Sequence, residues 1–393
     1  MTDVFVTGIG IISAIGLNKE QNLKSLLNQQ TGVGKIQILD TVHKNEFVAG
    51  EINKTNKELS AISGINNYEK QSRTTLLALI AAKEAVADAK IDVGEMPVAF
   101  ISATTVGGMD ITENFFDTAN ENTDNHFVIT DYLNNHTEEV CRFLGIKHFA
   151  TTISTACSSS ANAIMLGARL IKSGQYKRVI VGGSDALSKF TLNGFNSLMI
   201  LDKNLCRPFD ENRKGLNLGE GAAYLVLESA ELAQNKNVYG KISGYANAND
   251  AYHQTASSPT GDGASMAMQE ALKVADLSPE EISYINVHGT ATPNNDESEG
   301  TALQRVFGDK PPAFSSTKAF TGHTLAAAGA IEAVFSLLAI KEKIIYPNLN
   351  LETAIQKFPF SAERKLIKDA ELTNVLSNSF GFGGNNTSII YSK

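Results

Sequence analysis

Short apolar segments alternate along this chain with longer segments of helical periodicity. Four segments rich in Val and Ile favour β-strands: Val4–Val6, Val98–Ser102, Arg178–Val181 and Ile282–Val287. Three longer segments carry apolar residues at helical spacing: Thr74–Asp88, Ser158–Ser173 and Ala326–Lys341. This alternation predicts an α/β chain in which central sheets are covered by helices.

No Pro-rich or Ser-rich linker divides the chain, which predicts one compact body. Two similar halves that meet near Leu232–Val238 are an open alternative, because the residues show no clear internal repeat. Glycines cluster beside apolar strands, and Gly8 and Gly10 are among the candidates for site-building loops, although a purely structural role is the equal alternative for each. No run of about eighteen apolar residues appears, and the N-terminus enters a strand rather than a signal peptide. We therefore expect a cytoplasmic protein that does not enter a membrane.

Charge and cysteine content exclude several classes of function. The formal net charge of −8 disfavours a nucleic-acid surface. Three cysteines without a Cys-x-x-Cys pair or a Cys/His cluster predict neither a disulfide framework nor a metal site. An acidic partner would therefore need a local basic patch. The candidates for that patch are Lys70, Arg73, Lys203, Arg207 and Lys214.

Cys157 is the candidate nucleophile. It lies between an extended segment and the predicted helix 158–173, which places its thiol at a helix N-terminus. Unpaired N–H groups and the helix dipole favour an anion there, so we expect a lowered thiol pKa. A buried structural cysteine is the alternative, and it is the interpretation preferred for Cys141 and Cys206.

Two histidines in small-residue loops suggest a partner for this thiol. His288 follows the strand 282–287, and His323 precedes the Ala-rich helix. Two neutral imidazoles that donate N–H bonds to an enolate oxygen would stabilise the charge formed when a malonyl thioester loses carbon dioxide. Lys318 and Glu299 are expected to pair nearby and to support the histidines, although a weak surface ion pair is the alternative.

Six motifs, taken together and in this order, resemble the elongating β-ketoacyl-acyl-carrier-protein synthases (KAS I/II type) of the thiolase superfamily. The resemblance covers nearly the whole chain. It rests on Thr155–Ser160, Arg207–Asp210 with Gly219–Ala222, Asp250–His253, His288–Pro293, Lys318–His323 and Asn378–Asn386.

The resemblance implies a thiolase-like, duplicated five-layered α-β-α-β-α fold with halves 1–235 and 236–393, usually in a homodimer. It implies an acyltransferase that performs a decarboxylative Claisen condensation between an acyl group on Cys157 and malonyl-acyl carrier protein. It further implies that the N–H groups of Cys157 and Phe382 form an oxyanion hole, that Phe382 gates the acyl pocket, and that Thr290, Thr292 and Phe380 contact the substrate arm. The enzyme would need no metal or cofactor of its own, because phosphopantetheine belongs to the carrier protein.

Departures from the family pattern leave the pathway open. Arg213–Leu216 replaces a more usual Arg-Asp-Gly-Phe, and the Cys-Ser-Ser-Ser run is reminiscent of polyketide-type ketosynthases. A specialised aryl-polyene or type II polyketide ketosynthase is therefore the alternative to fatty acid synthesis. A degradative thiolase would need a second cysteine near Gly381–Asn386, an initiating synthase would lack His323, and a non-catalytic chain-length factor would lack Cys157. A papain-like protease has no supporting local sequence.

Overall fold

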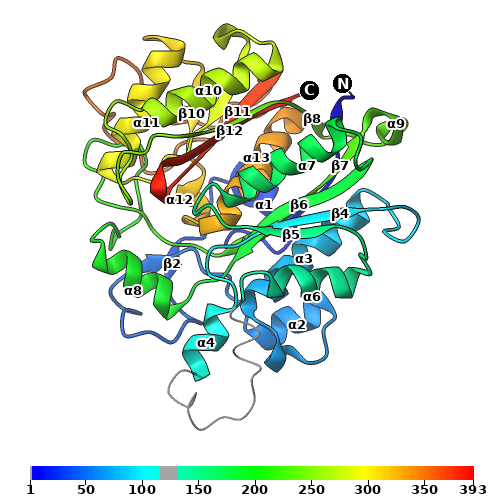
Figure 1. Cartoon of the computed structure of the whole chain (residues 1–393). Coiled ribbons are helices and arrows are strands. Elements are labelled where there is room, and N and C mark those ends of the chain that lie inside the picture. Colours follow the sequence, from blue (N-terminus) through cyan, green and yellow to red (C-terminus); the bar gives the residue numbers. More distant parts are fainter. Residues whose placement is uncertain (1, 116–131) are drawn as a thin grey trace.

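A computed structural model describes residues 2–115 and 132–393 and contains one large mixed sheet (Figure 1). The order of its ten strands is β10-β9-β11-β12-β8-β1-β7-β6-β4-β5. The strands are β1 (Val4–Ser13), β4 (Ala99–Ala103), β5 (Ala150–Ile153), β6 (Arg178–Asp185), β7 (Gly221–Ser229), β8 (Gly240–Asn249), β9 (Tyr284–Asn286), β10 (Ala313–Ser315), β11 (Asn374–Gly381) and β12 (Asn385–Ser392). A separate hairpin joins β2 (Gly34–Lys35) to β3 (Val48–Ala49).

The sheet consists of two halves with the same topology. The first half has the order β5-β4-β6-β7-β1 and the second has the order β10-β9-β11-β12-β8. In each half the first three strands are parallel to one another. The third and fourth strands, and the fourth and fifth, pair antiparallel. The halves join where β1 pairs with β8 at Phe5–Lys241 and Val6–Gly240. The fold is therefore a structural duplication, and we infer that the halves meet between Ala233 and Gly240.

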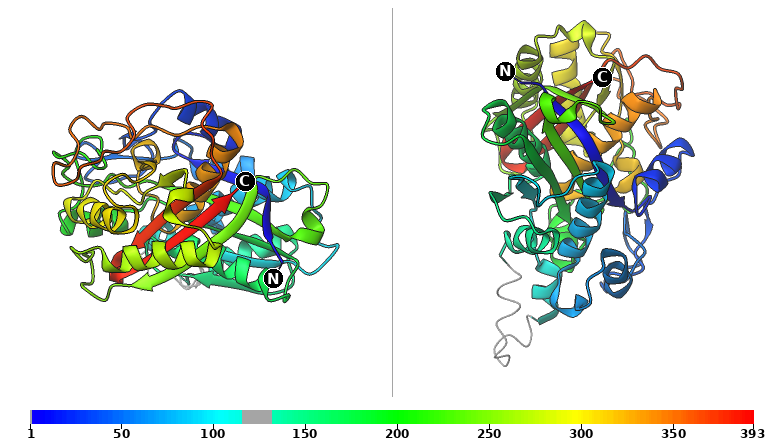
Figure 2. Two further views of the ribbon diagram at one scale, coloured as in Figure 1. Left: turned by 90° about the horizontal axis from the view of Figure 1, so that it is seen from above. Right: turned by 90° about the vertical axis from the view of Figure 1, so that its right-hand side faces the viewer.

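Helices form three layers around and between these half-sheets (Figures 1 and 2). The helix α3 (Arg73–Asp88) packs on β1 and β7, while α10 (Asp262–Ala275) packs on β8 and β12 at the opposite side of the molecule. Between the half-sheets, α7 (Ser159–Lys172) contacts β6 and β12, and α13 (Ala328–Glu342) contacts β7 and β11. Residues 328–340 are all buried, as expected for a helix enclosed by two sheets. The predicted five-layered α-β-α-β-α arrangement is confirmed.

The remaining helices surround this core. They are α1 (Lys19–Leu27), α2 (Asn56–Ser63), α4 (Met109–Phe115), α6 (Asn135–Leu144), α8 (Lys189–Ser197), α9 (Ala230–Ala233), α11 (Pro293–Phe307) and α12 (Lys318–Thr321). Short 3₁₀ helices are η1 (Tyr68–Lys70), η3 (Pro279–Glu281), η4 (Leu325–Ala327) and η5 (Phe382–Gly384). In the described part of the chain, none of the helices has both the length and the apolar character needed to cross a bilayer.

Two of the glycines predicted to build a site have another role. Gly8 and Gly10 lie inside β1, which continues to Ser13 rather than ending near Val6. A Cβ atom at Gly8 would lie 2.4 Å from the carbonyl oxygen of Ala85, and one at Gly10 would lie 2.0 Å from that of Ala81. These glycines therefore let α3 approach the strand backbone closely, and the prediction of a site-building loop is wrong for them.

Candidate active site

Cys157 lies in the turn between β5 and α7, directly before the N-cap residue Ser158. The preceding Ala156 has a φ of +52°, an unfavourable conformation for a residue with a side chain. The end of β11 packs against this turn, because a Cβ atom at Gly381 would lie 3.1 Å from the Cys157 nitrogen. The predicted position at a helix N-terminus is confirmed, and the turn fixes the direction of the thiol.

The predicted lowering of the Cys157 pKa is wrong. Burial raises the pKa of this thiol to about 11, and the nearby Lys318 charge and N–H bonds from Phe382 and from Cys157 itself oppose the rise only in part. The side chain is only 6% exposed, so loss of hydration outweighs the helix terminus. The resting residue is therefore a thiol, with the N–H groups of Cys157 and Phe382 directed at its sulfur.

His288 and His323 lie side by side in the same buried site. His288 follows β9, and His323 lies between α12 and η4. Their ring centroids are 5.4 Å apart, with the ring planes at 85°. Burial lowers the pKa of both rings well below the usual value, and the Lys318 charge lowers both further. Both imidazoles are therefore neutral at physiological pH.

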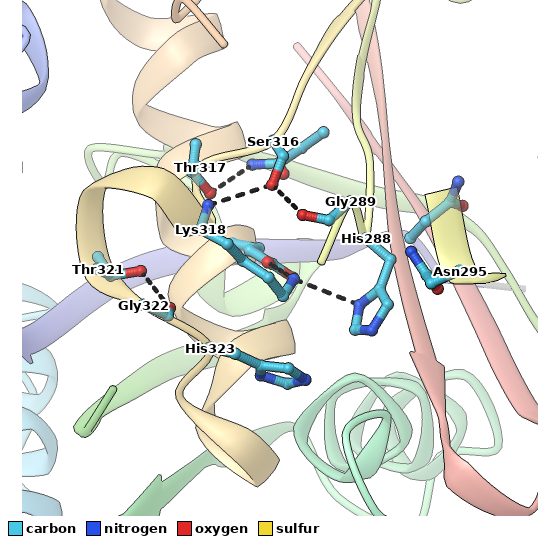
Figure 3. Close-up of polar contacts among 12 residues, drawn as sticks. His288, Gly289, Asn295, Ser316, Thr317, Lys318, Thr321, Gly322 and His323 are labelled. Carbon is cyan, nitrogen blue, oxygen red and sulfur yellow. Dashed lines mark hydrogen bonds and ion pairs between the residues drawn. The ribbon is translucent and has the colours of Figure 1, made fainter. Parts of the chain in front are cut away.

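The hydrogen-bond partners of both rings assign the same tautomer, and Figure 3 shows the bond to the His288 ring. Lys318 Nζ donates to His288 Nδ1 at 3.3 Å, and the backbone N–H of Leu325 donates to His323 Nδ1 at 3.2 Å. A neutral imidazole whose Nδ1 accepts a hydrogen bond carries its proton on Nε2. Each ring therefore keeps an Nε2–H donor available for a substrate oxygen.

Lys318 pairs with Glu332 rather than with Glu299, so the predicted ion pair is wrong. Lys318 Nζ bonds the Glu332 carboxylate, and both side chains are 3% exposed. Glu332 was missed although a signal existed, because it is the only charged residue in the apolar stretch 328–340. Buried charges usually require such a partner. Burial raises the pKa of Glu332 to about 7.

Glu299 does not pair with Lys318, and instead holds the loop that contains His288. Its carboxylate accepts the backbone N–H groups of His288 and Gly289, both at 2.8 Å, and the Asn378 amide at 3.1 Å. Burial raises its pKa to about 7. Glu299 comes from α11, whose inward face reaches the backbone after β9, whereas Glu332 comes from α13 beneath Lys318. The two glutamates therefore support different parts of the site.

One cavity of about 320 Å³ gathers most of the predicted site residues. Thr290 and Thr292 both line it, with their hydroxyl oxygens 2.9 Å apart. Lys318 and Glu299 lie behind the histidines and do not line it. The predicted residues in its wall are Cys157, His288, Thr290, Thr292, His323, Phe380 and Phe382.

A second, mostly apolar cavity of about 360 Å³ lies beside the first. Cys157, Phe195 and Phe382 line both cavities. The Phe382 ring stacks on Phe195 of α8, with centroids 5.8 Å apart and planes at 19°. Phe195 is a second residue that sequence reasoning missed, since α8 gives no local signal of a role. Phe382 therefore stands where a chain attached to Cys157 would pass from one cavity to the other.

The loop that carries Phe382 contains two glycines and is held by hydrogen bonds to neighbouring segments. Gly383 and Gly384 have φ values of +81° and +77°, which favour glycine. Asn249 Nδ2 donates to the Gly383 carbonyl at 2.8 Å, and the Gly383 N–H donates to the Gln254 carbonyl at 2.8 Å. A side chain at Gly384 would lie 2.0 Å from an Asp250 oxygen. The loop therefore adopts one defined position in this state.

The predicted basic patch is only partly at the surface. Arg73 is buried and forms two hydrogen bonds with the Glu220 carboxylate, at 2.6 and 2.8 Å, so its inclusion is wrong. Lys203 pairs with Glu46, and Arg207 pairs with both Asp210 and Glu352. Lys70 and Lys214 are exposed. Because the Arg73 charge is buried and paired with Glu220, it is not presented at the surface to a partner.

Across residues 2–115 and 132–393, no cluster of three or more His, Cys, Asp or Glu side chains is arranged to hold a metal ion. All three cysteines are free and buried. The chemistry that the described residues offer is therefore that of a thiol, two neutral imidazoles and backbone N–H donors.

Comparisons with known proteins agree with this site. The N-terminal domain model of β-ketoacyl synthases matches residues 1–233, and the C-terminal domain model matches residues 239–352. The 3-oxoacyl-[acyl-carrier-protein] synthase 2 of Staphylococcus aureus (strain COL) is 35% identical over 409 residues, covering 99% of this chain and 98% of that protein.

Solved structures support the same assignment. The ishigamide ketosynthase/chain length factor superposes with a TM-score of 0.94 at 30% identity, covering 100% of this chain and 99% of that chain. A ketosynthase from Xenorhabdus doucetiae in complex with its chain length factor gives a TM-score of 0.86 at 30% identity, covering 100% and 98%. Both matches extend over the thiolase-like duplication described above. The chain therefore belongs to the β-ketoacyl synthase family of condensing acyltransferases.

Proposed function

We propose that this enzyme joins an acyl group on Cys157 to a malonyl unit carried by acyl carrier protein, with loss of carbon dioxide and a gain of two carbons. The observation that carries the proposal is the pair of neutral imidazoles, each with an Nε2–H, beside a thiol in one cavity. A single imidazole beside a thiol would fit many acyl transfers. Two neutral donors fit a reaction that passes through an enolate.

In the first half-reaction, the Cys157 sulfur attacks the carbonyl carbon of an acyl thioester. A new C–S bond forms while the carrier thiol leaves with the proton that Cys157 gives up. The N–H groups of Cys157 and Phe382 stabilise the tetrahedral oxyanion, a role supported by their position against the sulfur. The acyl chain then occupies the apolar cavity beyond Phe382.

In the second half-reaction, the malonyl C–C bond to the carboxylate breaks and its electrons form an enolate. The Nε2–H groups of His288 and His323 stabilise the enolate oxygen. The carbanion carbon attacks the acyl carbonyl, a C–C bond forms, and Cys157 leaves as a thiolate that is then protonated. Lys318, held by Glu332, and Glu299 act as positioning residues for His288.

Two pathways fit this chemistry. Fatty acid synthesis is supported by the name of the Staphylococcus aureus relative, a 3-oxoacyl-[acyl-carrier-protein] synthase 2. Polyketide or aryl-polyene synthesis is supported by the ketosynthase and chain length factor structures. We propose an acyl carrier protein as partner, a cytoplasmic location and a homodimer, with no cofactor of its own and neither nucleic acid nor membrane as ligand. Three free cysteines fit a reducing compartment.

The test is a mass measurement on intact enzyme after incubation with acyl carrier proteins that bear saturated chains of different lengths. We expect one acyl adduct, on Cys157, in wild-type enzyme and in the control Cys206→Ala, and none in Cys157→Ala. An adduct that survives in Cys157→Ala would overturn the assignment of the nucleophile. Molar mass by light scattering, in the presence and absence of a candidate chain length factor, tests the homodimer against a heterodimer.

A further inference from the structure

Asp185, the last residue of β6, is a fully buried carboxylate that joins three segments. It accepts hydrogen bonds from the hydroxyl groups of Thr104 and Thr105, from the Thr105 N–H at 3.1 Å, and from the Ala326 N–H at 2.8 Å. In the described part of the chain these partners are neutral donors. The carboxylate therefore accepts several hydrogen bonds from neutral groups and is not half of an ion pair.

The segments held by Asp185 form two walls of the apolar cavity. Thr105 and Val106 line one side, and Leu325 lines another. The Thr105 hydroxyl lies 2.6 Å from one Asp185 oxygen, and the Ala326 N–H donates to the same oxygen. One carboxylate oxygen thus ties the loop after β4 to the start of η4, so the distance between these walls depends on it.

Asp185 is also connected to His323, through the strained residue Leu325. Leu325 has a φ of +52°, a conformation that costs of order 1–3 kcal/mol for a residue with a side chain and persists only where surrounding contacts impose it. Its own N–H donates to His323 Nδ1, and the next N–H, from Ala326, donates to Asp185. Asp185 therefore holds in place the turn that assigns the His323 tautomer.

A carboxylate is required at this position because both of its oxygens accept hydrogen bonds. Burial is the main cause of the raised pKa of the nearby Cys157 thiol, and the Asp185 charge raises that pKa further, which by itself disfavours a nucleophile. An amide at this position would place an NH₂ donor against an N–H or a hydroxyl group. The anion beside the thiol is therefore best explained by its role as an acceptor for several donors at once.

We propose that Asp185 is a positioning residue that sets the acyl-chain selectivity of the enzyme by fixing both walls of the apolar cavity, and that it orients His323 through Leu325. The inference rests on the proposed condensing function. It adds a single residue, outside the lining of both cavities, to which both substrate choice and decarboxylation are coupled.

The test compares Asp185→Asn with wild-type enzyme and with Glu84→Gln. Glu84 is a suitable control because its carboxylate also accepts two backbone N–H groups, from Ile11 and Lys19, but on α3 and away from the site. Each enzyme is incubated with an equimolar mixture of acyl carrier proteins that bear saturated chains of different lengths. The chains attached to the enzyme are then identified by mass spectrometry of the intact protein. Malonyl decarboxylation is measured on the same samples.

For Asp185→Asn we expect discrimination between the preferred chain and one two carbons longer to fall about tenfold, the range that small changes in an apolar pocket produce. Decarboxylation should fall about 10- to 100-fold, as expected for a misplaced catalytic group. Glu84→Gln should change neither. An unchanged chain profile in folded Asp185→Asn, or equal losses in Glu84→Gln, would overturn the proposal.

Thr105→Val and Thr105→Ser keep the proposal testable if Asp185→Asn does not fold. Thr105→Val removes one hydroxyl donor to Asp185 at nearly constant volume, so the chain profile should broaden, whereas Thr105→Ser should restore the wild-type profile. Identical profiles in both variants would overturn the proposal. A wild-type enzyme that acquires no acyl group would instead refute the proposed function, which separates the two failures.

Discussion

Replacing Phe382 by alanine tests whether this ring is a gate or simply part of the core. The ring is only partly buried and stacks on Phe195. Complete burial would make the truncation cost about 3–5 kcal/mol, whereas loss of one stacked, partly exposed ring should cost about 1–2 kcal/mol. With about 2.1 cal/mol/K of unfolding entropy per residue, a chain of 393 residues loses about 1.2 °C of Tm per kcal/mol. We expect a fall in Tm of about 2 °C.

The functional effect should exceed this small loss of stability. Without the ring, malonyl units can reach the histidines before Cys157 is acylated, so carbon dioxide release should rise relative to condensation product. Phe195→Ala, which removes the stacked partner and leaves Phe382, should give a smaller rise in the same direction.

Phe100→Ala supplies the matched control for a core ring. Phe100 is fully buried, stacks on Tyr224 with centroids 5.4 Å apart, and lines neither of the cavities at Cys157. Its truncation should cost about 3–5 kcal/mol, or about 4–6 °C of Tm, without uncoupled decarboxylation. A Phe382→Ala enzyme that loses Tm like Phe100→Ala and releases no extra carbon dioxide would refute the gate.

Four further predictions concern catalysis, pH and charge. Cys157→Ala should abolish condensation and retain some malonyl decarboxylation, and His288→Ala or His323→Ala should lower decarboxylation by about 10²–10³; unchanged release of carbon dioxide would remove that histidine from the mechanism. Burial lowers the pKa of His136 to about 4, so the unfolded chain binds its proton first as pH falls below about 6.5. The contribution of His136 to stability should therefore fall by about 3 kcal/mol between pH 6.5 and 4, so the difference in free energy of unfolding between wild-type and His136→Asn, measured with urea, should change by that amount over this range. If a basic surface steers the carrier protein, KM should rise with salt and with Lys214→Glu, whereas indifference to both would place the docking surface elsewhere.

Local sequence determined the elements and the reactive residues of this enzyme. The pattern of apolar residues predicted α3, α7 and α13 closely, because a helix that is buried on one face or on all faces needs apolar residues at the corresponding positions of its sequence. Cys157 at a helix start, and His288 and His323 in small-residue loops, were recognisable because glycine, threonine and short side chains around a polar group leave room for a substrate.

Only the tertiary structure decided which buried charges meet. Lys318 joins Glu332 rather than Glu299 because the fold brings the Glu332 carboxylate of α13 against the lysine, and spacing along the chain carries no such information. The thiol pKa depended on how completely the site excludes water, so a helix terminus alone predicted the wrong direction. The duplication, which the family resemblance implied, left no clear internal repeat among the residues, because the two halves share strand order and helix placement through backbone geometry that many different side chains satisfy.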